Sequence, residues 1–275
     1  MAESGVVTFI GFDSAWADNP KAPGAICSAT IARDRWLEFH APELVGFDQA
    51  LAFIEARDRV DAATLIALDQ PTIVTNDAGM RPVEKVVASV ISWMGGGVQP
   101  ANLGRPFFGP QAPVSRFLAK LGAVEDPEVA RAAVRGRHLI EVFPALALAS
   151  LGDGFFGRSM GPRYNPARRG TFRIENWRAV VDAARLEAAR FHCASLVGWL
   201  DGLASLATPS KSDQDRLDAA LCLLIAMRWR LAPRSESTML GDVNSGYIVA
   251  PVREKVMTRL REEAARRNVP VDAIR

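Results

Sequence analysis

The chain is poor in the residues that build disulfide frameworks and zinc sites. It has 3 cysteines and 3 histidines among 275 residues. Cys27, Cys193 and Cys222 lie far apart among apolar neighbours, and no CxxC or Cys/His zinc spacing occurs. We therefore expect reduced cysteines in a protein core and no structural zinc.

The sequence also lacks a strong net charge and a long apolar run. The formal net charge is +2, which gives no global attraction to nucleic acid or to a membrane, so any basic surface must be local. No apolar segment reaches membrane-spanning length. Residues 1–5 have neither the basic region nor the apolar stretch of a signal peptide. We expect a cytoplasmic protein without membrane partners.

Two common catalytic motifs are missing. There is no G-x-S-x-G nucleophile elbow and no histidine in a suitable place after a strand, which excludes a serine hydrolase. The glycine run at 95–97 lacks the Gly-Lys-Ser/Thr ending of a phosphate loop and does not follow a strand, so it indicates a flexible turn.

What the chain does have is a repeated pairing of buried strands with acidic residues. Residues 6–13 end at Asp13, residues 64–69 end at Asp69, and the run at 138–144 contains Glu141. A lone aspartate in such a place can simply cap a turn. A carboxylate at a buried strand end otherwise costs free energy unless it is paired, hydrogen-bonded or bound to metal. If the three strands are neighbours, their acids form a site for a hard divalent cation.

The order of the predicted elements brings two of these acids together. Strands at 6–13, 25–31 and 35–40 form an antiparallel meander, and a helix at 47–57 leads to the strand at 64–69. A helical crossover makes that last strand parallel to its neighbour. Placing it beside the first strand puts Asp13 next to Asp69. Further predictions are helices at 81–94, 112–121, 175–191, 213–230 and 254–268 and a polar connector at 234–246. Residues 247–251 form either a short strand or a segment that covers the site.

The predicted amphipathic helix at 213–230 carries two more acids. Ser212 or Asp213 can cap its start, and Asp215 and Asp218 share one helical face. The positive end of the helix explains Asp215 but not Asp218, which stands among apolar residues. We predict metal-binding roles for both.

A basic loop at about 153–178 interleaves arginines with aromatic residues. Such a mixture suits phosphate contacts and base stacking, although a solvated surface loop has the same composition and a phosphorylated small molecule is also compatible. The candidate substrate-binding residues are Asn76 and Arg81, which follow Asp69, and Arg163, Tyr164, Arg168 and Arg169.

Five motifs in this order resemble the DUF429 family of predicted ribonuclease-H-like nucleases. They are Gly11-Phe12-Asp13-Ser14-Ala15-Trp16; Ala67-Leu68-Asp69-Gln70-Pro71 with Asn76 and Gly79-Met80-Arg81-Pro82; Ile140-Glu141-Val142-Phe143-Pro144; Asp215-Arg216-Leu217-Asp218-Ala219-Ala220; and Gly246-Tyr247-Ile248-Val249-Ala250-Pro251. The resemblance implies an α/β, ribonuclease-H-like mixed sheet: a three-strand antiparallel meander plus parallel strands, with helices on both faces. We expect one domain over 1–275, with a helical and loop insertion at about 71–136.

The function expected from these residues is two-metal phosphodiester hydrolysis with Mg²⁺ or Mn²⁺. Asp13, Asp69, Glu141 and Asp218 are the predicted catalytic residues, and Asp13, Asp69, Asp215 and Asp218 the predicted metal ligands. Glu141 has an alternative role, which is to orient a ligand or bind an arginine.

The expected partner is DNA or RNA, and because resolvase-like relatives of this fold act as dimers, a homodimer is a further expectation. Two other functions stay open. One is a non-catalytic domain that binds nucleic acid or a partner, and the other is a metal-dependent enzyme for a nucleotide or another phosphorylated small molecule.

Overall fold

A five-stranded mixed sheet organises the computed structural model, which describes residues 5–152 and 154–272. The first four residues and Asp153, at the start of the predicted basic loop, lie outside this range. The strand order is β3-β2-β1-β4-β5. The first three strands are an antiparallel meander, and β4 and β5 run parallel to β1. The strands are β1 Val7–Asp13, β2 Gly24–Ala32, β3 Arg35–Val45, β4 Ala63–Asp69 and β5 Gly136–Glu141. The predicted mixed α/β fold is confirmed, and it is consistent with a ribonuclease-H-like fold.

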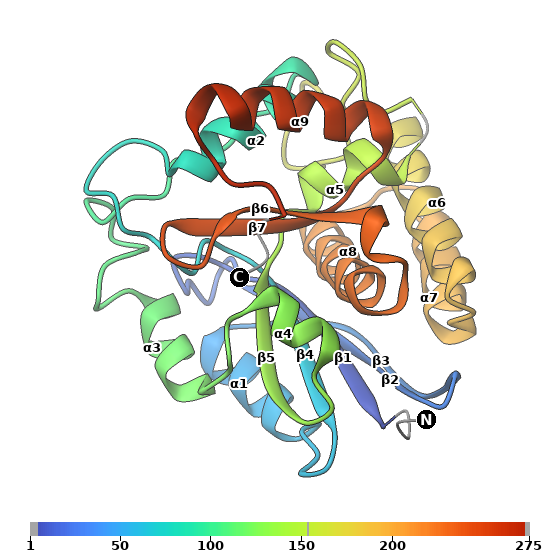
Figure 1. Cartoon of the computed structure of the whole chain (residues 1–275). Coiled ribbons are helices and arrows are strands. Elements are labelled where there is room, and N and C mark those ends of the chain that lie inside the picture. Colours follow the sequence, from blue (N-terminus) through green and yellow to red (C-terminus); the bar gives the residue numbers. More distant parts are fainter. Residues whose placement is uncertain (1–4, 153, 273–275) are drawn as a thin grey trace.

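Helices α1 (Phe47–Glu55) and α3 (Pro113–Leu121) cover one face of this sheet (Figure 1). Alternate residues of β1, Ile10 and Phe12, enter the core beneath them. Phe12 packs edge-on against Phe47 and Phe117, with ring centroids 5.7 Å apart in each pair. Because side chains alternate along a strand, the residues Phe9, Gly11 and Asp13 project to the opposite face.

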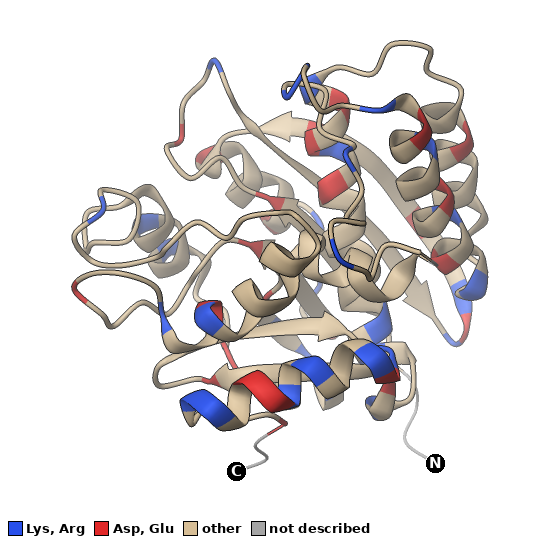
Figure 2. Cartoon of the chain, turned by 90° about the horizontal axis from the view of Figure 1, so that it is seen from above, with Lys and Arg blue, Asp and Glu red and all other residues tan. Residues whose placement is uncertain are grey.

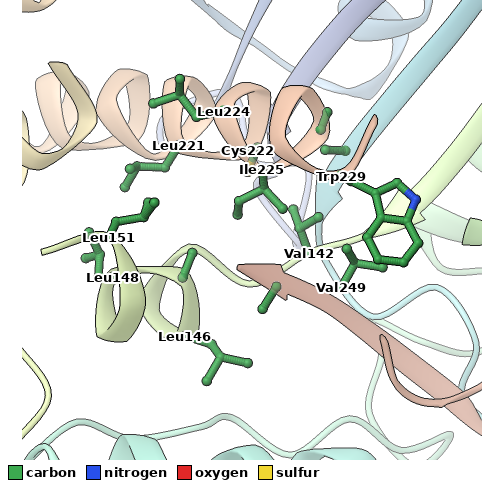
Figure 3. Packing of buried hydrophobic residues seen from close by; sticks show 14 of the residues in the cluster. Val142, Leu146, Leu148, Leu151, Leu221, Cys222, Leu224, Ile225, Trp229 and Val249 are labelled. Atoms are coloured by element: carbon green, nitrogen blue, oxygen red, sulfur yellow. The ribbon is translucent and has the colours of Figure 1, made fainter. Parts of the chain in front are cut away.

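Helix α8 (Lys211–Leu231) covers that opposite face. The sequence predicts an amphipathic helix here, but the structure buries residues 217–229 on all sides. Figure 3 shows the reason: Leu221 and Ile225 of α8 point toward α5 (Pro144–Leu151), on the side away from the sheet. Helices α6 (Ile174–Arg190) and α7 (Ala194–Ala204) complete this layer. A helix that is buried on all sides lies in the centre of a fold, as α8 does here.

A hairpin lies above α8 in Figure 1, and two helices lie above the hairpin. Strands β6 (Ser237–Asp242) and β7 (Gly246–Pro251) form a separate antiparallel pair, and α2 (Pro82–Trp93) and α9 (Glu254–Arg267) pack together on it. The predicted strand at 247–251 is therefore present. The predicted polar connector at 234–246 is wrong, because it contains a 3-10 turn at Arg234–Glu236 and strand β6.

The segment between β4 and β5 holds α2, α3 and the short helix α4 (Pro127–Ala132). Positive and negative residues are interspersed over the ribbon in Figure 2, in keeping with the small net charge of +2. The three cysteines are free and buried, as predicted. Across residues 5–152 and 154–272, no helix has the length and apolar character needed to cross a membrane.

Candidate active site

The sheet places Asp13 and Asp69 side by side. They are register partners in the parallel pair β1–β4, and both project to the face that α8 covers. Gly11, on the same face, allows α8 to approach closely. A Cβ on Gly11 would lie 2.1 Å from the carbonyl oxygen of Ala219 and 2.3 Å from the backbone nitrogen of Leu223. This contact between strand and helix backbone brings Asp218 to the two strand-end acids.

Two polar side chains hold Asp218, which is 7% exposed. The Tyr164 hydroxyl donates a 2.8 Å hydrogen bond to Oδ1, and the side-chain amide of Gln214 donates to Oδ2. Burial raises the pKa of Asp218 to about 6, against the lowering effect of these two hydrogen bonds and of the Lys211 charge. The Asp218 side chain is therefore held in one orientation, and other aspartates lie close to it.

The two strand-end acids share that environment. Burial raises the pKa of Asp13 well above its usual range, and the charges of Asp218, Asp69 and Asp215 raise it further. Burial likewise raises the pKa of Asp69, followed by the charge of Asp218. Carboxylates so close together repel one another when ionised, and a cation relieves that repulsion.

One lysine already lies in this acidic group. Lys211 is in the first turn of α8, where the helix dipole disfavours a cation, and its ammonium donates a hydrogen bond to Asp215. Burial lowers the pKa of Lys211, but the hydrogen bond and the charge of Asp215 outweigh it, so the pKa is raised overall. The acids explain a lysine at this position.

The cap of α8 differs from the predicted one. Ser210, rather than Ser212 or Asp213, is the N-cap, and its hydroxyl accepts from the Asp213 backbone N–H. Asp213 in turn accepts from the Ser210 backbone, which completes a capping box. This arrangement starts α8 two residues earlier than predicted and brings Lys211 and Gln214 into the site.

The acids lie in a cleft of about 620 Å³. Its polar lining combines the four aspartates with cationic, amide and aromatic side chains: Asp13, Asp69, Asp215, Asp218, Lys21, Arg163, Arg168, Lys211, Gln214, Tyr164 and Trp16. The structure thus brings together three of the predicted catalytic residues, all the predicted metal ligands and three of the predicted substrate-binding residues.

Glu141 and Arg81 do not line this cleft. Glu141 is the register partner of Leu68, one residue short of Asp69, so strand alternation directs it to the opposite face from Asp69. There it meets the Arg81 guanidinium at 2.5 Å, with exposed fractions of 2% and 1%. Arg81 also bonds Glu84 and so has no surface left for a substrate. Of the two predicted roles for Glu141, the structure shows the binding of an arginine.

Asn76 and Arg169 also lie outside the cleft lining. The Asn76 amide donates to the carbonyl oxygens of Ala78, Gly79 and Ala101, so it fixes the loop after β4. Arg169 is exposed on the basic loop. These positions do not support the predicted substrate contacts.

Sequence reasoning missed Trp16, Lys211 and Gln214. Signals for all three were present. Trp16 ends the first motif, while Lys211 and Gln214 each stand four residues before an aspartate, a spacing that puts the two side chains of each pair together on a helix.

The donor chemistry of the cleft fits a hard divalent cation. Asp13, Asp69 and Asp218 offer carboxylate oxygens, the ligands that Mg²⁺ and Mn²⁺ prefer. The buried Oε1 of Gln214 has no hydrogen-bond partner and is a further oxygen donor next to Asp218. Within the described part of the chain, no group of three or more His, Cys, Asp or Glu side chains is already arranged around a metal position. To bind an ion, Asp218 would therefore have to give up its hydrogen bond from Tyr164 or from Gln214.

A family model described as "Protein of unknown function (DUF429)" matches residues 18–239. The chain belongs to the DUF429 family. The match includes Asp69, Asp215 and Asp218, while Asp13 precedes it. No curated protein and no solved structure matches the chain. Since the DUF429 description assigns no activity, the function must be argued from the cleft itself.

Proposed function

We propose that this DUF429 protein is a divalent-metal-dependent nuclease that hydrolyses phosphodiester bonds. The observation that supports this most is the convergence of Asp13, Asp69 and Asp218 in one cleft, from two adjacent strand ends and a central helix. Such acids are costly unless a cation or protons neutralise them. A cleft that also contains lysine and arginine side chains suits an anionic substrate.

Asp13, Asp69 and Asp218 would hold Mg²⁺ or Mn²⁺, with Gln214 Oε1 as a neutral donor. The bound cation would supply a hydroxide at neutral pH and stabilise charge on the leaving oxygen. Tyr164 and Gln214 fix the orientation of Asp218. Asp215 pairs with Lys211, so it would serve a second cation only if Lys211 moved away.

The cationic side chains support nucleic acid as the substrate. Lys21 and Arg168 are exposed at the cleft, and Arg163 is half-buried in its wall. Lysine and arginine at such positions contact phosphates without reading sequence. A cytoplasmic location accords with the free, buried cysteines. A homodimer stays a prediction.

A second candidate is a metal-dependent enzyme for a nucleotide or another phosphorylated small molecule. The cleft volume of about 620 Å³ favours it, because small-molecule sites commonly measure about 300–1,000 Å³. The third reading, a domain that only binds nucleic acid or a partner, is supported by no separate observation.

The deciding experiment is cleavage of labelled DNA and RNA, single-stranded, duplex and branched, with Mg²⁺ or Mn²⁺. Asp13→Asn and Asp69→Asn should each abolish cleavage, because they remove the acids shared by the metal site. Asp182→Asn, at an α6 side chain that is 58% exposed, is the matched control and should cleave like wild type. Failure of wild type on every polymer, with hydrolysis of a nucleotide or small phosphodiester, would favour the second candidate.

A further inference from the structure

A fixed segment roofs the cleft. Residues 157–173, here called the roof segment, form most of the connection from α5 to α6, and the Tyr164 hydroxyl at its centre bonds Asp218. At one end, Ser159 and Gly161 donate backbone hydrogen bonds of 2.8 and 2.9 Å to the C-terminus of α2.

Further bonds anchor the middle of the roof segment. The Arg163 side chain donates to the Gly95 carbonyl at 2.8 Å, and its backbone N–H donates to Asn176 Oδ1 of α6 at 2.7 Å. The Arg173 backbone N–H donates to the Arg163 carbonyl at 2.9 Å. With attachments to α2, α6 and α8, the roof segment is part of the cleft wall, and entry of a bulky substrate would break several of these bonds.

The Trp16 indole, fixed by its neighbours, forms another part of the cleft wall. Trp16 follows Asp13 by three residues, and its indole N–H donates to the Asp69 carbonyl at 3.4 Å. Phe107 and Phe108 pack edge-on against the indole, with centroid distances of 6.4 and 5.3 Å. The indole is half-buried and lines the cleft, so it offers a pre-positioned surface for a planar group beside the acids.

The dimensions of the cleft limit what can reach these acids. A duplex presents two backbones around a major groove about 12 Å wide, and its bases are stacked inside. The cleft has the volume of a small-ligand site, and Asp218 beneath the roof segment is 7% exposed. A nucleotide that is free to leave its neighbours fits such a cleft, as in enzymes that enclose a single nucleotide.

Resting on the nuclease function proposed above, we propose that the cleft takes the terminal nucleotide of a single strand, with its base stacked on Trp16, and that the enzyme releases nucleotides from a strand end. Water attacks the phosphorus of the terminal diester, and the bond from phosphorus to the leaving sugar oxygen breaks. That oxygen gains a proton, so the products are a nucleoside monophosphate and a strand shortened by one residue. The cations Lys21 and Arg168 contact the phosphates that follow.

The test compares linear and covalently closed circular single strands of identical sequence, as DNA and as RNA, with Mn²⁺. The expected result is degradation of the linear strand with early release of mononucleotides, and an intact circle at the same enzyme dose. Opening of the circle at a rate similar to digestion of the linear strand would overturn the proposal. Digestion of a blunt duplex as fast as of the linear single strand would do the same.

A small diester separates this proposal from the nuclease function itself. Bis(p-nitrophenyl) phosphate has no base and no strand end, so its hydrolysis reports only the chemistry at the acids. If it is hydrolysed and circles are cut, the terminal-nucleotide proposal alone is wrong. If it is hydrolysed and no polymer is digested, the small-molecule candidate replaces both proposals. If neither it nor any polymer reacts, the nuclease function fails, and this proposal fails with it.

Trp16 variants test the stacking. Aromatic stacking on a base contributes about 1–3 kcal/mol, so Trp16→Ala should lower kcat/KM on the linear strand about 5- to 150-fold relative to bis(p-nitrophenyl) phosphate. Trp16→Phe keeps an aromatic face and should restore most of the ratio. Trp36→Phe, a half-buried tryptophan outside the cleft, is the control. Equal losses on both substrates in Trp16→Ala would show a structural role and contradict stacking.

Discussion

The buried carboxyl group of Asp218 lowers the stability of the metal-free protein when it is ionised. Its pKa is about 6 in the folded protein, above the ordinary value of 3.8, so the folded state keeps a proton that the unfolded chain has already released. Stability from this group is therefore present at low pH, falls as the pH rises from about 3.8 to about 6, and stays low above that.

We therefore predict that Asp218→Asn stabilises the metal-free protein at pH 7 to 8. Tyr164 can still donate to the new amide oxygen, and a rotated Gln214 amide can accept from its nitrogen through Oε1, which now has no partner. The measurement is Tm in EDTA, compared with Asp182→Asn. A lower Tm for Asp218→Asn at both pH 5 and pH 8 would contradict this account.

Addition of Mn²⁺ should stabilise the wild-type protein, and more so at high pH. Ligand at a hundredfold excess over Kd stabilises by about 2.7 kcal/mol, so saturating Mn²⁺ should raise the Tm of wild type by several degrees. The increase should be larger at pH 8 than at pH 5, because protons compete for the acids. Asp218→Asn should lose most of the increase. An equal shift in wild type and variant would place the metal elsewhere.

Tyr164 should extend Mn²⁺ binding to lower pH. Its hydroxyl lowers the pKa of Asp218 by hydrogen bonding, against the larger effect of burial. Tyr164→Phe should raise that pKa and shift the pH midpoint of Mn²⁺ binding to higher pH, as measured by calorimetry. Phe172, a half-buried aromatic of the roof segment outside the cleft lining, offers Phe172→Leu as the control. An unchanged midpoint in Tyr164→Phe would show that this hydrogen bond does not tune Asp218.

At the scale of elements, the contact between β1 and α8 determines whether the acids meet. Gly11→Ala should lower the free energy of unfolding by about 3 kcal/mol or more, because the new methyl group would overlap backbone atoms that cannot rotate away. The control is Gly198→Ala in α7, where a Cβ meets nothing within 4 Å and should stabilise by about 0.5–1 kcal/mol. Urea unfolding measures both. The Gly11 variant should also bind Mn²⁺ more weakly, since α8 must shift relative to β1.

The sequence is sufficient for elements whose pattern is local. The apolar runs ending at Asp13 and Asp69, with a helix between the two strands, predict their adjacency, and β1 and β4 have this arrangement. Strand β6 was missed because Ser237-Thr238 and Gly241-Asp242 flank only two apolar residues. Helix α7 was missed because Gly198 and Gly202 interrupt its pattern.

The site was harder to predict where it depends on register or on distant partners. A difference of one residue along β5 decides which face Glu141 occupies, and nothing in the local sequence fixes that register. The partner of Glu141 is Arg81, which is 60 residues away. The packing of α5 on the outer side of α8 likewise joins distant segments, so no local pattern predicts it.

At the scale of the whole molecule, the Arg81–Glu141 pair connects three parts of the chain. Arg81 precedes α2 and donates to the Ile73 carbonyl in the loop after β4, while the Glu141 backbone N–H donates to the Tyr247 hydroxyl of β7. Breaking a buried pair costs about 3–5 kcal/mol, so Glu141→Gln should unfold at lower urea concentration with nearly unchanged Mn²⁺ affinity. Loss of Mn²⁺ affinity without loss of stability would restore the predicted catalytic role of Glu141.

The order of the acids along the chain has a consequence for biosynthesis. Asp13 and Asp69 leave the ribosome early, whereas Asp218 belongs to the helix that covers their side of the sheet. At about 5–20 residues per second, an interval on the order of ten seconds separates Asp69 from Asp218. During it the nascent sheet exposes Phe9 and Leu65, which α8 later buries, and it is prone to aggregate. A nascent or truncated chain that ends before α8 therefore lacks Asp218 and leaves the apolar face that α8 covers open to aggregation.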